Sequence, residues 1–117
     1  MDKEKIYQEK MEALHAAWNA AKEGADYHPS LELLNQKQLE EIAAESGLGI
    51  KHVRIVSNGP GGRICSECIQ MDGQVFSLAS EMKKPHLPNK ACKCTGYNEH
   101  QTGFCLCYYE VVFEDEL

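Results

Sequence analysis

The sequence predicts an α+β domain in which two N-terminal helices precede a small antiparallel β module. Three observations lead to this class. Apolar residues in the first part of the chain recur at helical spacing, whereas short β-branched runs follow from about residue 50 onward. All six cysteines lie in this second part. A chain of 117 residues fits one domain, 1–117, with a helical part over 1–49 and a cysteine-rich part over 50–117.

The first helix is predicted over residues 2 to about 24, where Gly24 is a stop signal. It carries an apolar stripe with spacings of three and four residues. The stripe consists of Tyr7, Met11, Leu14, Trp18, Ala21 and Ala25. This stripe either packs in the core of its own domain or forms a short coiled-coil seam, through which two chains would pair as a homodimer.

A break is predicted at 27–29, because proline disfavours helix at the residue before it. A second helix follows over about 36–46, with Asn35 as N-cap and Gln38 completing a capping box. Gly47 supplies the left-handed residue that ends many helices. The apolar face of this helix is formed by Leu39, Ile42 and Ala43.

The second part of the chain is predicted to contain three short strands, because its β-branched and apolar residues alternate between turn signals. Proline residues at 85 and 88 mark a loop before the last strand. The expected elements are a strand over 51–57, a strand over 74–78, a helical turn over 79–84 and a last strand over 104–113.

Residues 39–58 also resemble a helix-turn-helix, in which Lys51, His52 and Arg54 would face DNA. Two observations argue against this alternative. The run Val-Arg-Ile-Val has strand character, and the net charge of the chain is −6. No basic patch supports nucleic acid as a partner.

Composition also bears on the compartment. No segment approaches the roughly 18 apolar residues that a membrane span needs. The N-terminal sequence MDKEKIYQEK lacks the apolar core of a signal peptide. A cytoplasmic location is therefore expected, and thiols stay reduced there. Six cysteines in a reducing compartment favour a metal site over disulfides.

The cysteines form the motif Cys65-x-x-Cys68, Cys92-x-Cys94 and Cys105-x-Cys107. A zinc ion prefers four thiolates in a tetrahedron, and the first pair would supply two of them. The other two come either from Cys92 and Cys94, or from Cys92 with Cys105 or Cys107. If 104–112 is a strand, Cys105 and Cys107 point to the same face.

Two further arrangements stay open. Two zinc ions sharing six cysteines is an alternative that a ligand from His86 or His100 would favour. An iron–sulfur cluster is the other. The spacing of His15, His28 and His52 does not fit metal ligation, and these are expected at the surface or at helix ends.

Motifs for catalysis are missing from the sequence. A catalytic zinc keeps an open position and usually has His or carboxylate ligands. The zinc deaminase signature and His-Glu-x-x-His are both absent. The all-sulfur set therefore predicts a structural zinc that staples the β module, in a protein that is not an enzyme.

The segment from 65 to 113 resembles the cysteine module at the C-terminal end of phage Mu F-like minor head (head morphogenesis) proteins. The resemblance lies in CSECIQMDGQVFSL, PHLPNKAC and CLCYYEVV, in that order. It implies a zinc-stapled β module of mobile-element origin, with Cys65 and Cys68 as the first knuckle. Position by position, the remaining ligands it implies are Cys92, Cys105 and Cys107.

Four of these five cysteines are expected to bind Zn²⁺. Cys94 matches no position of the family pattern and is the alternate ligand. The function predicted from the sequence is that of a small zinc-binding phage-type protein that acts through a protein partner. The alternatives are the DNA-binding regulator described above and an acidic inhibitor of a host defence enzyme.

Overall fold

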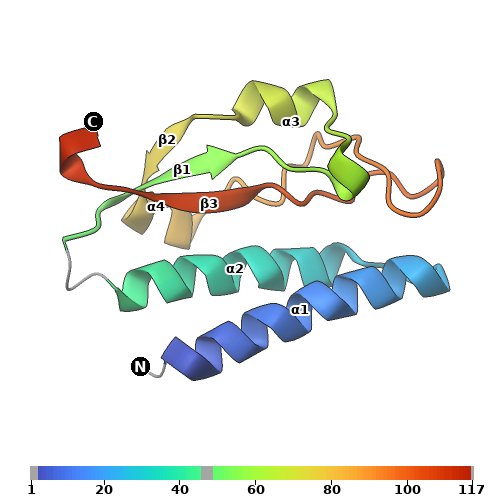
Figure 1. The fold of residues 1–117 in the computed structure, drawn as a ribbon, viewed down its shortest axis with the longest axis horizontal. Helices are drawn as coiled ribbons and strands as arrows, with labels where there is room; N and C mark the ends of the chain where they lie inside the picture. Colours follow the sequence, from blue (N-terminus) through green and yellow to red (C-terminus); the bar gives the residue numbers. More distant parts are fainter. Residues whose placement is uncertain (1–2, 46–48, 117) are drawn as a thin grey trace.

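The computed structural model describes residues 3–45 and 49–116, and it confirms the α+β class (Figure 1). The strands form one antiparallel sheet in the order β2-β1-β3. In chain order the elements are α1 (Lys3–Glu23), α2 (His28–Ala44), β1 (His52–Val56), η2 (Pro60–Gly62), α3 (Ser66–Met71), β2 (Val75–Ser77), α4 (Leu78–Lys83), β3 (Tyr108–Val112) and η3 (Glu114–Glu116).

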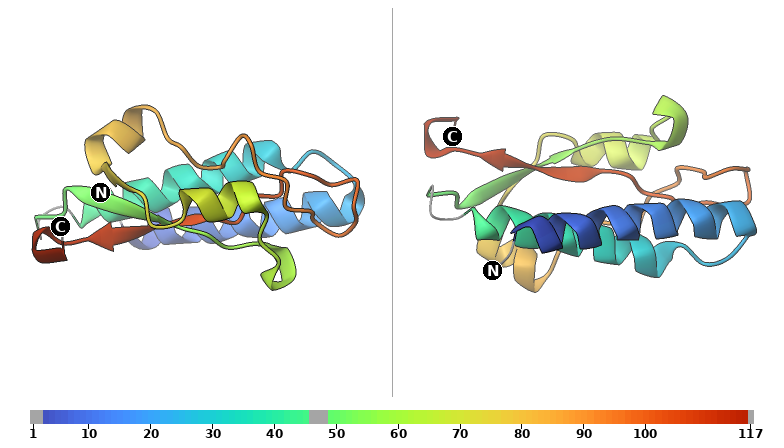
Figure 2. Two further views of the ribbon diagram at one scale, coloured as in Figure 1. Left: turned by 90° about the horizontal axis from the view of Figure 1, so that it is seen from above. Right: turned by 60° about the horizontal axis from the view of Figure 1, so that its bottom comes forward.

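The two long helices lie side by side and antiparallel, and together they make one layer beneath the sheet (Figures 1 and 2). The short helix α3 lies on the side of the sheet away from them (Figure 2). Val53 and Ile55 of β1 are fully buried, whereas their neighbours along the strand are only partly buried. This alternation directs one face of the central strand into the core.

The contact between α1 and α2 is built on alanines. Ala13, Ala17 and Ala21 recur every fourth residue and are buried against α2. Their small side chains let the two helices approach closely. Ion pairs flank the contact, with the Lys10 ammonium 2.8 Å from the Glu41 carboxylate.

The predicted apolar stripe on α1 coincides with the buried face only in part: Ala21 lies on that face, and the other members lie beside it or outside it. Tyr7 is half exposed, and Ala25 is exposed and lies beyond the end of the helix. Leu14 and Trp18 are partly buried and pack beside the alanines. The larger side chains line the edge of the contact because only small ones fit at its centre.

The predicted start of the second helix is wrong by eight residues, because α2 begins at His28. Pro29 lies in the first turn, where a missing N–H costs nothing. The Asp26 carboxylate accepts a hydrogen bond from the His28 backbone N–H at 3.0 Å and so satisfies a free donor of that turn. Gly47, the predicted helix end, lies outside the described residues.

The predicted capping box is also wrong, because Asn35 and Gln38 lie in the middle of α2. Their spacing puts them on one face of the helix. The Asn35 amide donates to the Cys107 carbonyl at 3.2 Å, and the Gln38 side-chain carbonyl accepts from the Tyr109 backbone N–H at 3.2 Å. The pair fixes the segment that leads into β3.

Asn35→Ala is expected to lower the free energy of unfolding by about 1–3 kcal/mol, because the buried Cys107 carbonyl loses its donor. Urea denaturation monitored by circular dichroism measures the change. Gln36→Ala, at an exposed position of the same helix, is the control. A change below about 0.5 kcal/mol in the Asn35 variant, as at ordinary surface positions, would contradict the role assigned to this hydrogen bond.

Two strand predictions agree with the structure and one does not. β1 and β2 lie within the expected ranges, and the helical turn over 79–84 is α4. The last strand begins at Tyr108 rather than at residue 104. Cys105 and Cys107 therefore precede the strand, in an irregular segment, and strand alternation does not govern where they point.

The helix-turn-helix alternative is wrong, because the residues of its recognition helix form β1. This strand pairs with β2 on one side and β3 on the other. The Arg54 guanidinium, expected to face DNA, lies 2.7 Å from the Glu110 carboxylate of the neighbouring strand. Cross-strand pairing thus accounts for the basic residue.

Candidate metal centre

The six cysteines come from three separate segments of the fold. Cys65 immediately precedes α3 and Cys68 lies in it. Cys92 and Cys94 belong to the loop after α4, and the remaining two precede β3. All six are free thiols, and all except Cys65 are buried in the larger core cluster of the protein.

Two groups of sulfur atoms occur in which every sulfur lies within 4.8 Å of the others. The first group consists of Cys65, Cys68, Cys92 and Cys94. The second consists of Cys68, Cys105 and Cys107. A tetrahedral zinc with Zn–S bonds of about 2.3 Å holds its sulfurs roughly 3.8 Å apart. The first group is therefore close to the geometry of a complete four-thiolate site.

The structure brings together all five predicted ligands and also the alternate, Cys94. Cys94 lies in the four-sulfur group, although the family pattern gave it no counterpart. Cys105 and Cys107 share the second group, although they are not on a strand. Sequence reasoning thus identified the cysteines that converge but did not divide them into these two groups.

A tight turn carries the chain from β1 toward Cys65. Within it, the Gly62 backbone N–H donates to the Gly59 carbonyl at 3.1 Å, and Arg63 donates to Pro60 at 3.2 Å. A Cβ atom on Gly59 would lie 1.7 Å from the Arg63 carbonyl oxygen. Only glycine fits this close approach, so the glycine-rich run is a structural turn that aims the first cysteine pair at the others.

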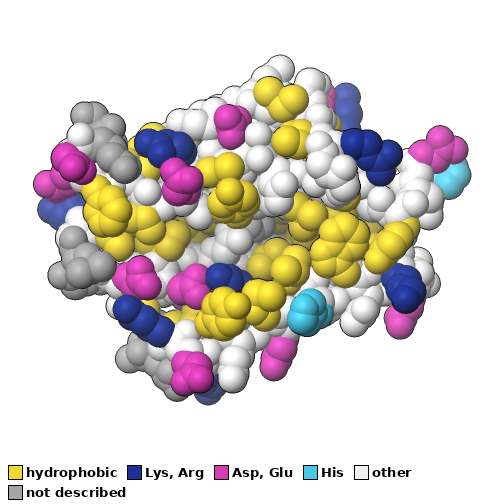
Figure 3. All heavy atoms as spheres, viewed as in Figure 1, with side chains coloured by type: hydrophobic (Ala, Val, Ile, Leu, Met, Phe, Trp, Pro, Cys, Tyr) yellow, Lys and Arg dark blue, Asp and Glu magenta, His cyan; other side chains and the backbone are white. Residues whose placement is uncertain are grey.

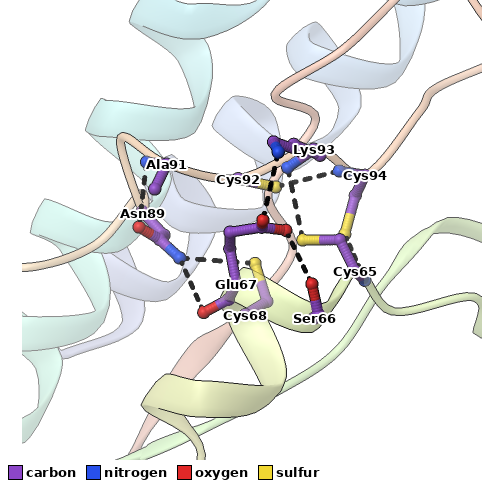
Figure 4. A network of polar contacts seen from close by, with 9 residues as sticks. All are labelled: Cys65, Ser66, Glu67, Cys68, Asn89, Ala91, Cys92, Lys93 and Cys94. Carbon is purple, nitrogen blue, oxygen red and sulfur yellow. Dashed lines mark hydrogen bonds and ion pairs between the residues drawn. The ribbon is translucent and has the colours of Figure 1, made fainter.

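Backbone N–H groups converge on the sulfurs (Figure 4). Lys93 donates to the Cys65 sulfur at 3.2 Å and Cys65 donates to that of Cys94 at 3.4 Å. The Cys94 N–H lies 3.3 Å from the Cys92 sulfur. Donors aimed at sulfur favour the thiolate over the thiol and position it for a metal.

Asn89 serves two more sulfurs and connects the two groups. Its backbone N–H donates to the Cys105 sulfur at 3.4 Å, and its side-chain amide lies 3.7 Å from that of Cys68. The same amide donates to the Glu67 carbonyl at 3.3 Å, which ties the loop to α3 (Figure 4). The sequence analysis did not identify this asparagine, although it directly follows Pro88 in the loop that leads to Cys92.

An ion pair lies at the rim of the cluster. The Lys93 ammonium lies 3.2 Å from the Glu67 carboxylate, which also accepts from the Ser66 hydroxyl at 3.1 Å (Figure 4). These residues come from the two segments that carry the first sulfur group. The rim contacts therefore join α3 to the loop after α4 without using the cysteines themselves.

The environment of the cluster lowers the pKa of some thiols and raises that of others. Burial raises the pKa of Cys65, but hydrogen bonds from the backbone N–H groups of Lys93 and Cys68 outweigh it and lower this pKa to about 7. The hydrogen bond from Cys107 and that from Cys92 lower the pKa of Cys105. Burial raises the pKa of Cys68 to about 12. Binding of a metal to the sulfurs whose pKa is raised would release protons, because the metal ligand is the thiolate.

The two candidate histidines lie outside both sulfur groups. The His100 side chain is 88% exposed, with its imidazole 3.9 Å from the Glu99 carboxylate. His86 directs its Nδ1 atom to the Glu81 carboxylate instead of to a sulfur. In the part of the chain that the structure describes, the converging donors at this centre are cysteine sulfurs alone.

Glu81 is a second feature that sequence reasoning missed. Its carboxylate is fully buried and accepts from the Tyr109 hydroxyl at 2.8 Å and from the His86 backbone N–H at 2.9 Å. Burial and the hydrogen bond to Glu81 raise the pKa of Tyr109. The Tyr109 hydroxyl also accepts from the Leu87 N–H at 3.2 Å. This network anchors the loop that leads from α4 to Cys92.

The chain matches no protein-family model, no curated protein and no solved structure. The resemblance to phage head proteins therefore stays a prediction. None of the helices within residues 3–45 and 49–116 combines the length and the apolar character needed to cross a bilayer.

Proposed function

We propose that this protein is a small zinc-binding protein whose metal centre has a structural role. The observation that carries the proposal is the convergence of six cysteine sulfurs, from three segments, in the core of the β part. Soft thiolate donors in a tetrahedral arrangement suit zinc or an iron–sulfur cluster. The hydrogen bonds that approach the sulfurs would hold the ligands in place for such a metal.

A structural role, rather than catalysis, is supported by the donor set. A catalytic zinc keeps one position open to water and has a general base within reach. Here four sulfurs suffice to fill the coordination sphere at the first group, and three of the four are buried. We therefore place the protein among non-enzymatic metal-stabilised modules.

Metal content distinguishes zinc from iron. Protein purified without chelator is analysed for bound metals by mass spectrometry and for visible absorption. Zinc with a colourless protein is the expected result, because zinc has no d–d transitions, whereas bound iron and visible absorption would overturn the zinc assignment. Cys68→Ser should lose metal, and Ser66→Ala, next to the site, should keep it.

A protein partner is the second part of the proposal. Figure 3 shows hydrophobic side chains gathered in a band across one face of the molecule. Among the exposed large residues, Tyr97 is 59% exposed and packs edge-on against Trp18 at 5.6 Å between ring centroids. Exposed apolar surface of this kind is typical of interaction sites. A phage or mobile-element origin is supported by the family resemblance alone.

Trp18, although only partly buried, is expected to contribute to core packing, and Tyr97 is expected to be a surface residue. Trp18→Glu should lower the free energy of unfolding by about 2–4 kcal/mol, because the indole packs on the fully buried Phe104 with ring centroids 4.6 Å apart. Tyr97→Glu should leave thermal unfolding nearly unchanged.

Sedimentation velocity over a range of concentrations then tests self-association. If two chains pair through the surface around Tyr97, Tyr97→Glu should be folded and monomeric where the parent protein is a dimer. A Trp18→Glu variant that keeps its stability but loses self-association would instead place Trp18 in the interface and not in the core.

A further inference from the structure

Six sulfurs converge where a single tetrahedral zinc would use only four. The two sulfur groups share Cys68 and are therefore not independent. If one ion occupied the first group, two buried thiols would be left next to it. These are Cys105 and Cys107, each 1% exposed. Their other polar contacts are long: Cys105 accepts from the Asn89 N–H at 3.4 Å, and Cys107 donates to the Asn58 carbonyl at 3.8 Å. The convergence of three sulfurs in the second group therefore calls for an explanation of its own.

The second group consists of three sulfurs, one fewer than tetrahedral zinc requires. Neither candidate histidine supplies the fourth ligand, because His86 is bonded to Glu81 and His100 is exposed. The Cys92 thiol does adjoin this group. Its sulfur lies within 4.8 Å of the Cys68 sulfur, and interaction with the Cys105 thiol raises the pKa of Cys92. Cys68 belongs to both groups, whereas Cys92 belongs to the first and adjoins the second.

We propose that the six cysteines bind two thiophilic divalent ions, zinc in the cell, with Cys68 and Cys92 each bridging both ions. The terminal ligands of the first ion are then Cys65 and Cys94. Those of the second ion are Cys105 and Cys107. Each ion receives four sulfurs, and all six cysteines are used. This inference rests on the proposed zinc-binding function and deepens it.

The chain order fits this arrangement. Cys68 and Cys92 each belong to a pair whose other member, Cys65 or Cys94, binds only the first ion. The second ion recruits the segment before β3 through two thiolates of its own. The pair of ions would therefore fasten all three cysteine segments to one another, whereas one ion in the first group would fasten only two of them.

The charge of the cluster is also accounted for. Two divalent cations neutralise four of six thiolate charges, and N–H donors from Lys93 and Asn89 stabilise the remaining negative charge. The Lys93 ammonium, on the loop between Cys92 and Cys94, adds a positive charge at the rim. Loading involves no oxidation or reduction. Each thiol that binds releases its proton to solvent as the metal–sulfur bond forms.

Cadmium, which takes the same thiolate ligands, provides the decisive measurement. The full chain is loaded with the magnetically active isotope, its metal content is counted by native mass spectrometry, and the cadmium NMR spectrum is recorded. We expect two cadmium ions per chain and two resonances that are split by coupling to each other. Such coupling passes through a shared sulfur, so it reports a bridging thiolate directly.

Single variants separate terminal from bridging ligands. Cys107→Ser should retain the first ion and lose or weaken only the second, whereas Cys68→Ser should weaken binding of both. The spectrum of the parent protein needs no variant, so the test remains decisive if a variant fails to fold.

The outcomes separate this inference from the proposed function. A count of one ion per chain would overturn the two-ion centre. It would leave the zinc-binding function standing. Two uncoupled ions would overturn the bridging cysteines. A folded protein that takes up neither zinc nor cadmium would overturn both proposals.

Discussion

If zinc fills the cysteine centre as proposed, its removal is expected to unfold the cysteine-rich part of the chain. Zinc binding contributes roughly 10–16 kcal/mol to the folding of small zinc modules. The whole stability of an ordinary domain is only about 5–15 kcal/mol. The buried cysteines lie in the same core cluster as Val53, Ile55 and Tyr109, so loss of the metal removes the support of the sheet as well as that of the loops.

Hydrogen exchange with and without a strong chelator measures this effect region by region. Protection should fall most over residues 63–107, which join the three cysteine segments. Added Zn²⁺ should restore it, and Mg²⁺, which prefers oxygen ligands, should not. A chelated protein that is shown to be metal-free, yet melts at the same temperature as before, would contradict a structural metal.

The Glu81→Ala variant is expected to lose about 3–5 kcal/mol of unfolding free energy. The carboxylate is fully buried, and its removal leaves the Tyr109 hydroxyl and the His86 groups without their acceptor. A cavity adds to the cost. Because Glu81 anchors the loop that carries Cys92, metal affinity should fall along with stability.

Glu99→Ala is the matched control, because the Glu99 side chain is 87% exposed. It should leave both urea denaturation and metal affinity unchanged. Glu81→Gln tests the chemistry further, since it preserves the volume but replaces one acceptor oxygen with a donor. It should fall between the parent protein and the alanine variant. Equal stability of all three forms would show that the network contributes nothing.

The existence of the long helices and short strands follows from periodicity, which local physics sets. The start of α2 does not, because Pro29 suits a helix break and a first helical turn equally well. Asp26 was the missing signal, as its carboxylate accepts a hydrogen bond from the His28 backbone N–H at the start of the helix. Asn35 shows the converse error: a residue type that favours caps is held inside a helix by a distant carbonyl.

The site shows where sequence reasoning reaches its limit. The motif spacing identifies which cysteines form local pairs, since Cys65 and Cys68 lie one helical turn apart. The distances between pairs depend on long irregular connections, which local rules do not fix. Glu81 belongs to a short helix with exposed neighbours, so nothing in its surroundings along the chain indicates that it is buried.

The hydrogen bond from Asn35 to the Cys107 carbonyl has a consequence for how the protein is made. During synthesis, α1 and α2 emerge first and can pair through contacts that are close in sequence. Four of the six sulfurs emerge before Cys105 and Cys107. The two helices and the first four cysteines would then be in place before the last two cysteines are made. The segment with Cys105 and Cys107 would pack on the helices and join the other sulfurs in one step. If the proposed metal is available at that moment, the chain would complete its fold. Without it, β3 would not be held in the sheet.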